Sequence, residues 1–340
     1  MKNLVVFGGA GFIGTNICKL ALSRGYRVYA FDSLMRPGVE ENLAFLKQLK
    51  GFHFIWGDIR NSSDFQNLPE KIDGLINVAA NPSIPKSFLN PRHDFECNVI
   101  GHLNILDYAR EHGGIPLIFA STMKVYTDSI NLLPLKENKT RLLLKEKKYR
   151  FGFDEKTDID GVDGFTNSPY GVSKFAADKY SREYAKHYGV PVVINRMSCI
   201  YGLYQKGVAD QGWLDWFVRA KKYGYPLTIF GSGKQVRDCL FGTDLAELYL
   251  LQMEKINQYS GKVFNVGGGP EEGFNTSLLE IIAHLNKNYP GPQLKLTFAD
   301  WRPSDQRVYI SDIRKVKKAT GWKPKTDIAK GVQQIWQSLP

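Results

Sequence analysis

Two side chains that could transfer a proton stand four residues apart in the stretch Pro-Tyr-Gly-Val-Ser-Lys. They are Tyr170 and Lys174, and a spacing of four residues puts both on one face of a helix. An ammonium group beside a phenol stabilises the phenolate, so we expect Lys174 to lower the pKa of Tyr170 from about 10 towards neutrality. Tyr170 would then act as a base on an alcohol. The same pair also occurs by chance on surface helices, so its meaning depends on its surroundings.

Two hydroxyl groups follow an apolar run elsewhere in the chain. Residues 116–120 read Pro-Leu-Ile-Phe-Ala, a pattern typical of a buried strand, and Ser121 and Thr122 come directly after it. Parallel α/β sheets carry their chemistry at the ends of strands. The next two residues are Met123 and Lys124, which do not form an acid and base pair.

A glycine-rich turn near the start of the chain predicts a dinucleotide site. Gly8, Gly11 and Gly14 follow an apolar run and precede a helical pattern. Glycines at these positions allow a tight turn and a close approach to a pyrophosphate, which the helix N-terminus then binds. Asp32, 18 residues after Gly14, can accept hydrogen bonds from ribose hydroxyls and would repel a 2′-phosphate, which favours NAD over NADP. Arg36, nearby in the sequence, argues against this preference for NAD, although Arg-Pro-Gly is equally typical of a turn.

Further residues suit the same cofactor. Asp58 follows the third strand-like run and could bind an adenine amino group, or alternatively cap a helix from Asn61 onward. Small residues in the segment 77–81, Asn-Val-Ala-Ala-Asn, leave room for the nicotinamide half. Lys174 can also bond the nicotinamide ribose. The expected NAD-binding residues are Gly8, Gly11, Phe12, Ile13, Asp32, Asp58, Ile59, Ala79, Ala80, Asn98, Tyr170 and Lys174.

Strand and helix patterns alternate through the first half of the chain. Strands are expected at 4–8, 27–31, 52–56, 74–78, 117–120 and 190–195, and helices at 12–23, 95–112 and 170–188. This alternation predicts an α/β fold, a Rossmann-type doubly wound parallel sheet with a smaller C-terminal α/β substrate-binding domain. We expect an NAD-binding domain at 1–202, with an insertion loop at 127–167 and some later segments returning to it. The nucleotide-sugar-binding domain is expected to cover most of 203–340.

Composition indicates a globular protein in a reducing compartment. The 340 residues are 43% hydrophobic, and the net charge is +11. The basic residues are dispersed apart from the run 139–150, and no nucleic-acid-binding motif accompanies them, so we expect no nucleic-acid partner. The four cysteines form no Cys-x-x-Cys pair, and no histidine cluster has metal-ligand spacing, so no metal is expected. Without a signal-peptide pattern or a membrane span, we expect a cytoplasmic protein with no membrane partner.

The motifs together resemble the extended short-chain dehydrogenases/reductases of the nucleotide-sugar epimerase/dehydratase group. They include the glycine turn, Asp58, the segment 77–81, Ser-Thr-x-x-Val-Tyr and Tyr-x-x-x-Lys. The resemblance implies a catalytic set of Thr122, Tyr170 and Lys174. One branch, the CDP-paratose 2-epimerases, is similar in Ser-Thr-x-Lys-Val-Tyr, in the long insertion, in Asp-Gln-Gly-Trp at 210–213 and in Ser-Asp-Gln-Arg-Val at 304–308.

The resemblance also implies a substrate site. Arginine forks match phosphate oxygens, so Arg237 and Arg302 are expected on a diphosphate; the alternatives are ion pairs with Asp238 and Asp305. The residues 227–230 are expected to contact the base through their backbone, and Asp-Gln-Gly-Trp either borders the sugar or only caps the helix from Gly212. The expected substrate-binding residues are Lys124, Asp210, Gln211, Trp213, Arg237, Arg302 and Arg307.

The implied activity is epimerisation of a nucleotide-diphosphate sugar, with a CDP-sugar favoured. Tyr170 would remove a hydroxyl proton, a hydride would pass to NAD, and its return to the opposite face of the ketone would invert the carbon. Sugar 4,6-dehydratases of the group place Asp and Glu after the catalytic Thr, where this chain has Met123 and Lys124, so a dehydratase is not expected. A UDP-sugar 4-epimerase and a non-catalytic NAD-binding regulator are the alternatives. Helices at 95–112 and 170–188 could form a four-helix homodimer interface.

Overall fold

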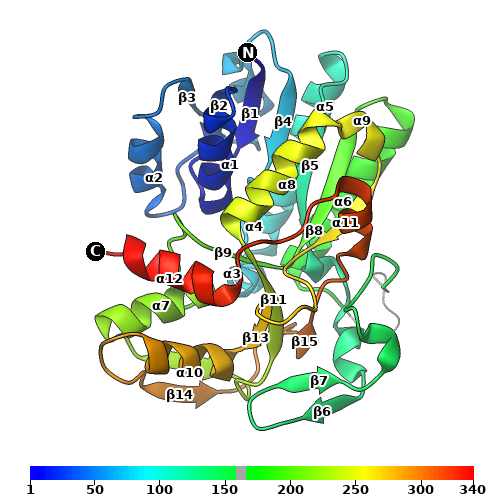
Figure 1. The fold of residues 1–340 in the computed structure, drawn as a ribbon. Helices are drawn as coiled ribbons and strands as arrows, with labels where there is room; N and C mark the ends of the chain where they lie inside the picture. Colours follow the sequence, from blue (N-terminus) through cyan, green and yellow to red (C-terminus); the bar gives the residue numbers. More distant parts are fainter. Residues whose placement is uncertain (158–165) are drawn as a thin grey trace. The chain divides into compact units, whose positions relative to one another are not determined.

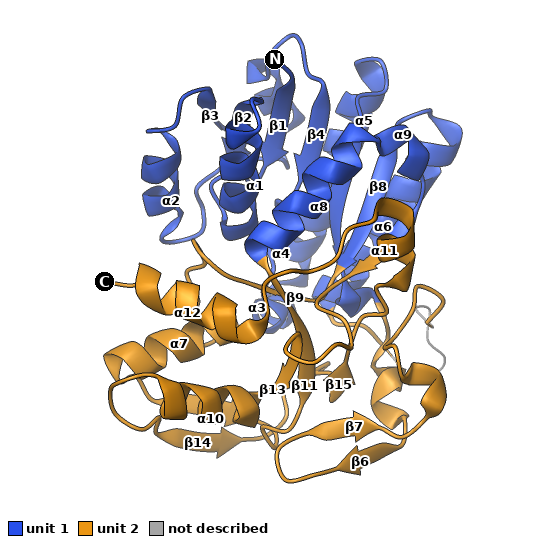
Figure 2. Ribbon diagram, viewed as in Figure 1, with its two compact units in different colours: residues 1–125, 169–196, 242–264 blue, residues 126–168, 197–241, 265–340 orange. Residues whose placement is uncertain are grey.

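The computed structural model describes residues 1–157 and 166–340, which divide into two compact units (Figure 2). Unit 1 comprises residues 1–125, 169–196 and 242–264, and unit 2 comprises 126–168, 197–241 and 265–340. These boundaries differ from the expected ones at 1–202 and 203–340. The described part of the 127–167 insertion belongs to unit 2, where Phe153 donates its backbone N–H to the carbonyl of Ile310. Residues 158–165 of that insertion lie outside the described residues.

A seven-stranded sheet forms the centre of unit 1, in the order β12-β8-β5-β4-β1-β2-β3 (Figure 1). β1 pairs in parallel with β2 and β4, so the strand order reverses at β1, the position where such sheets bind ligands. The expected Rossmann-type sheet is therefore confirmed. Its strands are β1 (Asn3–Phe7), β2 (Arg27–Asp32), β3 (Phe52–Trp56), β4 (Gly74–Asn77), β5 (Leu117–Thr122), β8 (Val192–Met197) and β12 (Val263–Val266).

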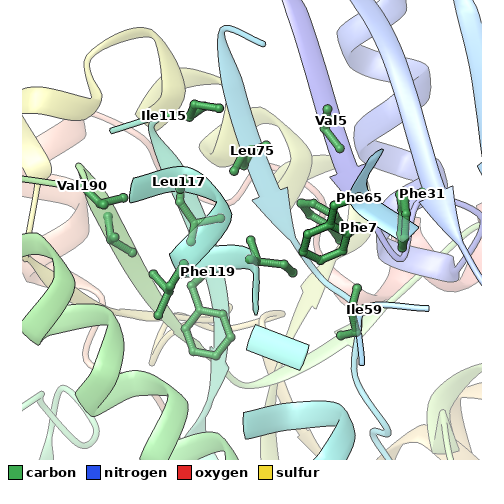
Figure 3. Packing of buried hydrophobic residues seen from close by; sticks show 14 of the residues in the cluster. Val5, Phe7, Phe31, Ile59, Phe65, Leu75, Ile115, Leu117, Phe119 and Val190 are labelled. Atoms are coloured by element: carbon green, nitrogen blue, oxygen red, sulfur yellow. The ribbon is translucent and has the colours of Figure 1, made fainter. Parts of the chain in front are cut away.

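Apolar side chains from these strands form the core of unit 1. Phe7 and Phe31 pack edge to face with ring centroids 5.3 Å apart, and Phe65 lies 5.5 Å from each (Figure 3). The main helices are α1 (Phe12–Ser23), α2 (Val39–Leu46), α3 (Ile84–Leu89), α4 (Pro91–Phe95), α5 (Gly101–Glu111), α6 (Pro169–His187), α8 (Gly242–Glu254) and α9 (Ile256–Tyr259). The helix expected at 95–112 is instead interrupted by a π-helical turn, η2 (Glu96–Ile100).

Unit 2 contains smaller sheets. β11 (Val236–Phe241) pairs with β9 (Cys199–Tyr201), β13 (Asn275–Ser277) and β15 (Val308–Tyr309). β10 (Leu227–Phe230) pairs in parallel with β14 (Leu296–Ala299), and β6 (Leu135–Glu137) forms a hairpin with β7 (Leu142–Leu144). The helices are α7 (Trp213–Tyr223), α10 (Leu278–Asn288), α11 (Arg314–Thr320) and α12 (Ile328–Ser338). α10 begins with a capping box in which Ser277 and Glu280 bond each other's backbone N–H.

The insertion contains more structure than the long polar connection that we expect from its sequence. Aromatic rings anchor it, because Phe153 packs between Tyr149 and Tyr309 at centroid distances of 5.0 and 5.5 Å. Part of the basic run is also paired, since Arg141 forms an ion pair with Glu280. None of the helices in the described ranges combines the length and the apolar character that crossing a membrane requires.

Candidate active site

The three expected catalytic side chains lie on two elements of unit 1. Thr122 ends strand β5, and α6 begins at Pro169, a residue whose missing N–H costs nothing at a first helical position. Tyr170 and Lys174 follow one turn apart on α6. A hydrogen bond joins the hydroxyl groups of Thr122 and Tyr170. The strand end and the helix start thus bring together two of the residues that the sequence pattern selected.

Ser121, the neighbouring hydroxyl, points to a different partner. Its Oγ donates to Oδ2 of Asp178 at 3.1 Å, and Asp178 is fully buried on α6. Arg196 of β8, also buried, donates from Nε to the same oxygen at 2.9 Å. Ser121 therefore helps to fix α6 against the sheet, and Thr122 is the hydroxyl that faces Tyr170.

The pKa of Tyr170 departs from our expectation. Burial raises it to about 12, and the nearby carboxylate of Asp94 adds to the increase, while the hydrogen bond with Thr122 opposes it. Lys174 is not among the groups that shift it. The prediction that Lys174 lowers the pKa of Tyr170 is therefore wrong for the protein alone, because desolvation of the phenolate dominates.

Lys174 itself is almost completely buried. Burial lowers the pKa of its ammonium to about 7, with a smaller opposing contribution from Asp178. Its Nζ lies 4.3 Å from the ring centroid of Phe119 on β5, a cation–π contact. Near neutral pH the lysine is thus close to its midpoint, so its charge responds readily to any anion that approaches.

The glycine turn has the geometry that a pyrophosphate needs. Gly8 has φ of +78°, and a Cβ there would lie 2.8 Å from the backbone nitrogen of Ala79. A Cβ at Gly14 would overlap the carbonyl oxygen of Gly8. Helix α1 starts after Gly11 with no side-chain cap and no acidic residue in its first turn, so its N-terminal N–H groups suit an anion. Phe12 and Ile13 of that first turn are half-buried.

Two carboxylates expected at the cofactor are held in defined positions. Asp32 ends β2 and accepts from the backbone N–H of Ala10 and Leu34 at 3.0 and 2.9 Å. Asp58 accepts from the backbone N–H and the guanidinium of Arg60. It does not cap the following 3₁₀ helix, Ser62–Asn67, whose N-cap is Asn61, so the capping alternative is wrong.

The remaining expected cofactor residues surround the loop after β4. The backbone N–H of Ala79 donates to Oδ1 of Asn77 at 3.0 Å, and Ala80 is half-buried beside it. Asn98, in the π-helical turn, is buried and accepts from the backbone N–H of Asn81 at 3.2 Å. Ile59 is buried in the core. The residues present therefore fit NAD: the turn and α1 would hold its phosphates, and Asp32 its ribose.

Unit 2 holds the two arginines expected on the diphosphate. Arg237 is nearly buried on β11 and pairs with Asp305, and Arg302 pairs with Asp210 at 3.5 Å. The alternative pairings, Arg237 with Asp238 and Arg302 with Asp305, are therefore both wrong. The Arg302 guanidinium also lies 3.9 Å from the ring centroid of Phe230 at the end of β10.

The other expected substrate residues occupy varied environments. Asp210 is exposed and meets Arg302, whereas Gly212, with φ of +77°, is the N-cap of α7 and uses no side chain. Trp213, the first residue of α7, packs edge to face on Phe217. The other residues of this set are Gln211, which forms an isolated β-bridge with Val208, and Arg307, which lies 5.5 Å from the ring of Trp301.

Lys124 belongs to unit 1 and is buried, in contrast to the surface lysine that its sequence context equally allows. It lies in the 3₁₀ turn η3 (Met123–Val125), and its backbone N–H donates to Oγ1 of Thr122 at 3.2 Å. Met123 is buried in the same turn. The segment after the catalytic strand thus carries one apolar and one basic side chain, and no carboxylate.

Sequence reasoning missed several buried polar residues beside this site. Asp94, Ser173 and Asp178 are buried, and His102 has both ring nitrogens bonded. Asn77 donates to Nδ1 of His102, so Nε2 carries the proton and donates to Ser181. No local pattern marks these residues, because several of their contacts join distant parts of the chain, such as His102 with Ser181 and Ser121 with Asp178. The described residues contain no group of three or more His, Cys, Asp or Glu that could hold a metal ion.

Known proteins are similar to this chain over nearly its whole length. A CDP-paratose 2-epimerase of Salmonella typhi is 38% identical, with 98% of each chain covered. The solved structure of a Thermotoga maritima UDP-glucose 4-epimerase with UDP-glucose has a TM-score of 0.78 and 26% identity, covering 98% of this chain and 97% of that one. A Bacillus anthracis dTDP-glucose 4,6-dehydratase in complex with NAD has a TM-score of 0.77 and 27% identity, covering 99% and 96%.

The family description agrees with the geometry of the glycine turn and the strand ends. The NAD dependent epimerase/dehydratase family matches residues 4–267, which include the glycine turn, Thr122, Tyr170 and Lys174. NAD is accordingly the cofactor. The chain belongs to the NAD dependent epimerase/dehydratase family.

Proposed function

We propose that this protein is a nucleotide-sugar 2-epimerase that converts CDP-paratose to CDP-tyvelose. The observation that carries the proposal is the site at the end of β5. There Thr122 bonds Tyr170, and the next two residues are the buried Met123 and Lys124 rather than two carboxylates. The full-length similarity to a CDP-paratose 2-epimerase supports the choice of sugar and base.

The proposed chemistry needs only the residues that are present. Thr122 holds a sugar hydroxyl, and Tyr170 takes its proton. NAD, when bound, accepts and returns the hydride and brings a positive charge on its nicotinamide ring. Tyr170 then gives the proton back after the ketone has presented its other face. A dehydratase must also eliminate water, which requires a further acid and base, and Met123 cannot carry a proton.

The pKa values indicate when Tyr170 becomes a base. In the protein alone burial holds its pKa at about 12, so the phenolate is scarce at neutral pH. A positive charge near the phenol favours the phenolate, but Lys174, whose pKa burial lowers to about 7, is not among the groups that shift Tyr170 in the protein alone. The base is therefore active mainly in the complex with cofactor.

The substrate half of the proposal rests on unit 2. Arg237 and Arg302 are the guanidinium groups assigned to the diphosphate, and each now pairs with an aspartate. Diphosphate binding would replace or share these pairs, since guanidinium forks bind phosphate in a bidentate manner. We assign the sugar to Lys124 and to the segment of Asp210, Gln211 and Trp213, and a further contact to Arg307.

Product analysis tests the proposed reaction. We expect purified protein to convert CDP-paratose carrying deuterium at carbon 2 to CDP-tyvelose, with the deuterium retained in the product as read by NMR. Retention is expected because the hydride leaves and returns without entering water. Loss of the label to solvent would reject oxidation at carbon 2. Conversion of UDP-glucose to UDP-galactose, without action on CDP-paratose, would establish the 4-epimerase alternative instead, and inactivity with bound NAD would favour a regulator.

We also propose that the protein forms a homodimer in the cytoplasm. Exposed apolar side chains on α3, α4 and α6 support an interface there: Leu89, Phe95, Val172 and Tyr180 are between 44% and 85% exposed. The four cysteines, all within the described ranges, form no disulfide, which suits a reducing compartment. Sedimentation equilibrium should give twice the mass of one chain, and Phe95→Glu should reduce it to one; a wild-type monomer would reject the dimer.

A further inference from the structure

A buried carboxylate lies next to the proposed catalytic tyrosine. Asp94, on α4, has no exposed surface, and within the described ranges no lysine, arginine or histidine forms an ion pair with it. Burial raises the pKa of its carboxyl to about 6, so it is mostly ionised at neutral pH. An ionised buried carboxylate without a cation is costly for folding, so a role other than stabilising the fold is indicated.

Two amide side chains hold this carboxylate. Asn81, in the loop after β4, donates from Nδ2 to Oδ2 of Asp94 at 3.3 Å, and Asn98, in the π-helical turn, donates from Nδ2 to Oδ1 at 3.3 Å. Oδ1 of Asn98 in turn accepts from the backbone N–H of Asn81 at 3.2 Å. Asp94 thus closes a ring of polar contacts with the loop that belongs to the NAD site.

The same network continues to the catalytic helix. Nδ2 of Asn98 donates to Oγ of Ser173 at 2.9 Å, and Ser173 donates to the backbone carbonyl of Tyr170 at 2.8 Å. Ser173 is buried one helical turn after Tyr170. The chain of contacts therefore runs from the loop after β4, through Asp94 and Asn98, to the residue that carries the proposed base.

Asp94 also acts on Tyr170 through its charge. Its carboxylate is among the causes that raise the pKa of Tyr170, after burial. A negative charge disfavours the phenolate, so Asp94 opposes ionisation of the base. This effect is the reverse of the one usually sought near a catalytic tyrosine.

On the basis of the proposed role of Tyr170, we propose that Asp94 is a positioning residue for the reaction. It holds the first turn of α6 in register with the cofactor loop through Asn98 and Ser173, and its negative charge adds to the effect of burial in keeping Tyr170 protonated in the protein alone. The phenol ionises more readily once bound cofactor places the positive charge of its nicotinamide ring nearby.

The pH dependence expected for this residue involves few other groups. The titratable and charged side chains nearest to Asp94 and Tyr170 along the elements packed around them are Lys86 on α3, Arg92 and His93 on α4, Glu96 and Cys97 on η2, His102 on α5, Lys174 and Asp178 on α6, and Lys124 on η3. Of these, Lys86, Arg92 and Glu96 are exposed or partly exposed. Further along, α6 carries Lys179, Tyr180, Arg182, Glu183, Tyr184, Lys186 and His187, and α5 carries Asp107, Tyr108, Arg110 and Glu111. Asp94 is the carboxylate identified as shifting Tyr170.

The test compares Asp94→Asn with Glu96→Gln, which removes a carboxylate two residues away on the solvent side. In Asp94→Asn the rising limb of kcat/KM against pH should move to lower pH by about one unit. The maximal kcat should fall about tenfold because the tyrosine is less well placed, with KM for the nucleotide sugar within twofold of wild type. Glu96→Gln should match wild type in both. If the rising limb of kcat/KM in Asp94→Asn stayed at the wild-type pH, the proposed effect of the Asp94 charge on Tyr170 would be rejected.

Ser173→Ala tests the positioning of Tyr170 separately from the charge of Asp94. It also provides a test of the proposal if Asp94→Asn fails to fold. It cuts the network next to Tyr170 without changing any charge, so kcat should fall while the limb stays at the wild-type pH. Full activity in Ser173→Ala would overturn the positioning part. Tyr170→Phe is measured in parallel: an active Tyr170→Phe rejects the proposed base, whereas an inactive one beside unchanged Asp94→Asn and Ser173→Ala rejects only the role of Asp94.

Discussion

Replacing Tyr170 with phenylalanine should lower kcat by about 10²- to 10⁴-fold, the usual contribution of a positioned general base. The substitution removes one oxygen and leaves the ring in place, so the fold should not change. Thr122 would lose its partner at Tyr170, but Thr122 also accepts from the backbone N–H of Lys124 and stays held. The measurement is the rate of product formation, together with the NAD content of the purified protein after denaturation.

The matched control is Tyr184→Phe on the same helix. Its hydroxyl also has a partner, since it donates to Oδ1 of Asp107 at 2.8 Å, yet it lies almost four turns from Tyr170. We expect wild-type kcat and wild-type NAD content from the control, and wild-type NAD content but little turnover from Tyr170→Phe. Turnover within tenfold of wild type in Tyr170→Phe would remove this residue from the mechanism.

The elements of unit 1 are predictable because their signals are local. Helix α1 has the expected bounds, since glycines precede it and its apolar residues repeat at helical spacing. The strand β3 also matches its expected range. The interruption of the 95–112 helix is different. Neither proline nor a change of period marks it, and the π-helical turn contains Asn98, whose partners Asn81 and Ser173 are distant in the sequence.

The sequence predicts which residue types form the site, but it does not predict which residues contact one another. Arg237 and Arg302 were chosen for their guanidinium chemistry, and each has an aspartate partner, but sequence proximity suggested the wrong ones. Asp305 pairs with Arg237 across 68 positions. The prediction that Lys174 lowers the pKa of Tyr170 is wrong for a similar reason. A helical spacing places Lys174 on the same face, but burial and Asp94, neither of which the spacing reveals, determine the direction of the shift.

Asp178 is another residue whose contacts the sequence does not predict. Among the substitutions considered, its removal should lower the free energy of unfolding the most. Asp178→Ala leaves the buried guanidinium of Arg196 without its carboxylate, and also removes the acceptor of Ser121. Breaking a buried ion pair by deleting one partner costs about 3–5 kcal/mol. We therefore expect the free energy of unfolding in urea to fall by that amount.

An exposed pair provides the comparison for this measurement. Asp107 pairs with Arg110 on α5, and both side chains are at least 40% exposed. Asp107→Ala removes this pair, which water screens, and also the acceptor of the Tyr184 hydroxyl, a hydrogen bond worth about 1 kcal/mol. The free energy of unfolding should therefore fall by no more than about 2 kcal/mol. Equal losses in the two variants would show that burial adds nothing to the Asp178 pair.

A double substitution identifies the stranded charge as the cause. Adding Arg196→Met to Asp178→Ala removes the uncompensated guanidinium and retains an unbranched side chain of similar length. Because the two residues touch, their effects should not be additive, and the double variant should regain at least about 1 kcal/mol over Asp178→Ala. Additive losses would mean that the helix is held by packing alone. The recovery should not restore turnover, because Lys174 loses the carboxylate that supports its charge, and the pKa of its ammonium, about 7 in the wild type, should fall.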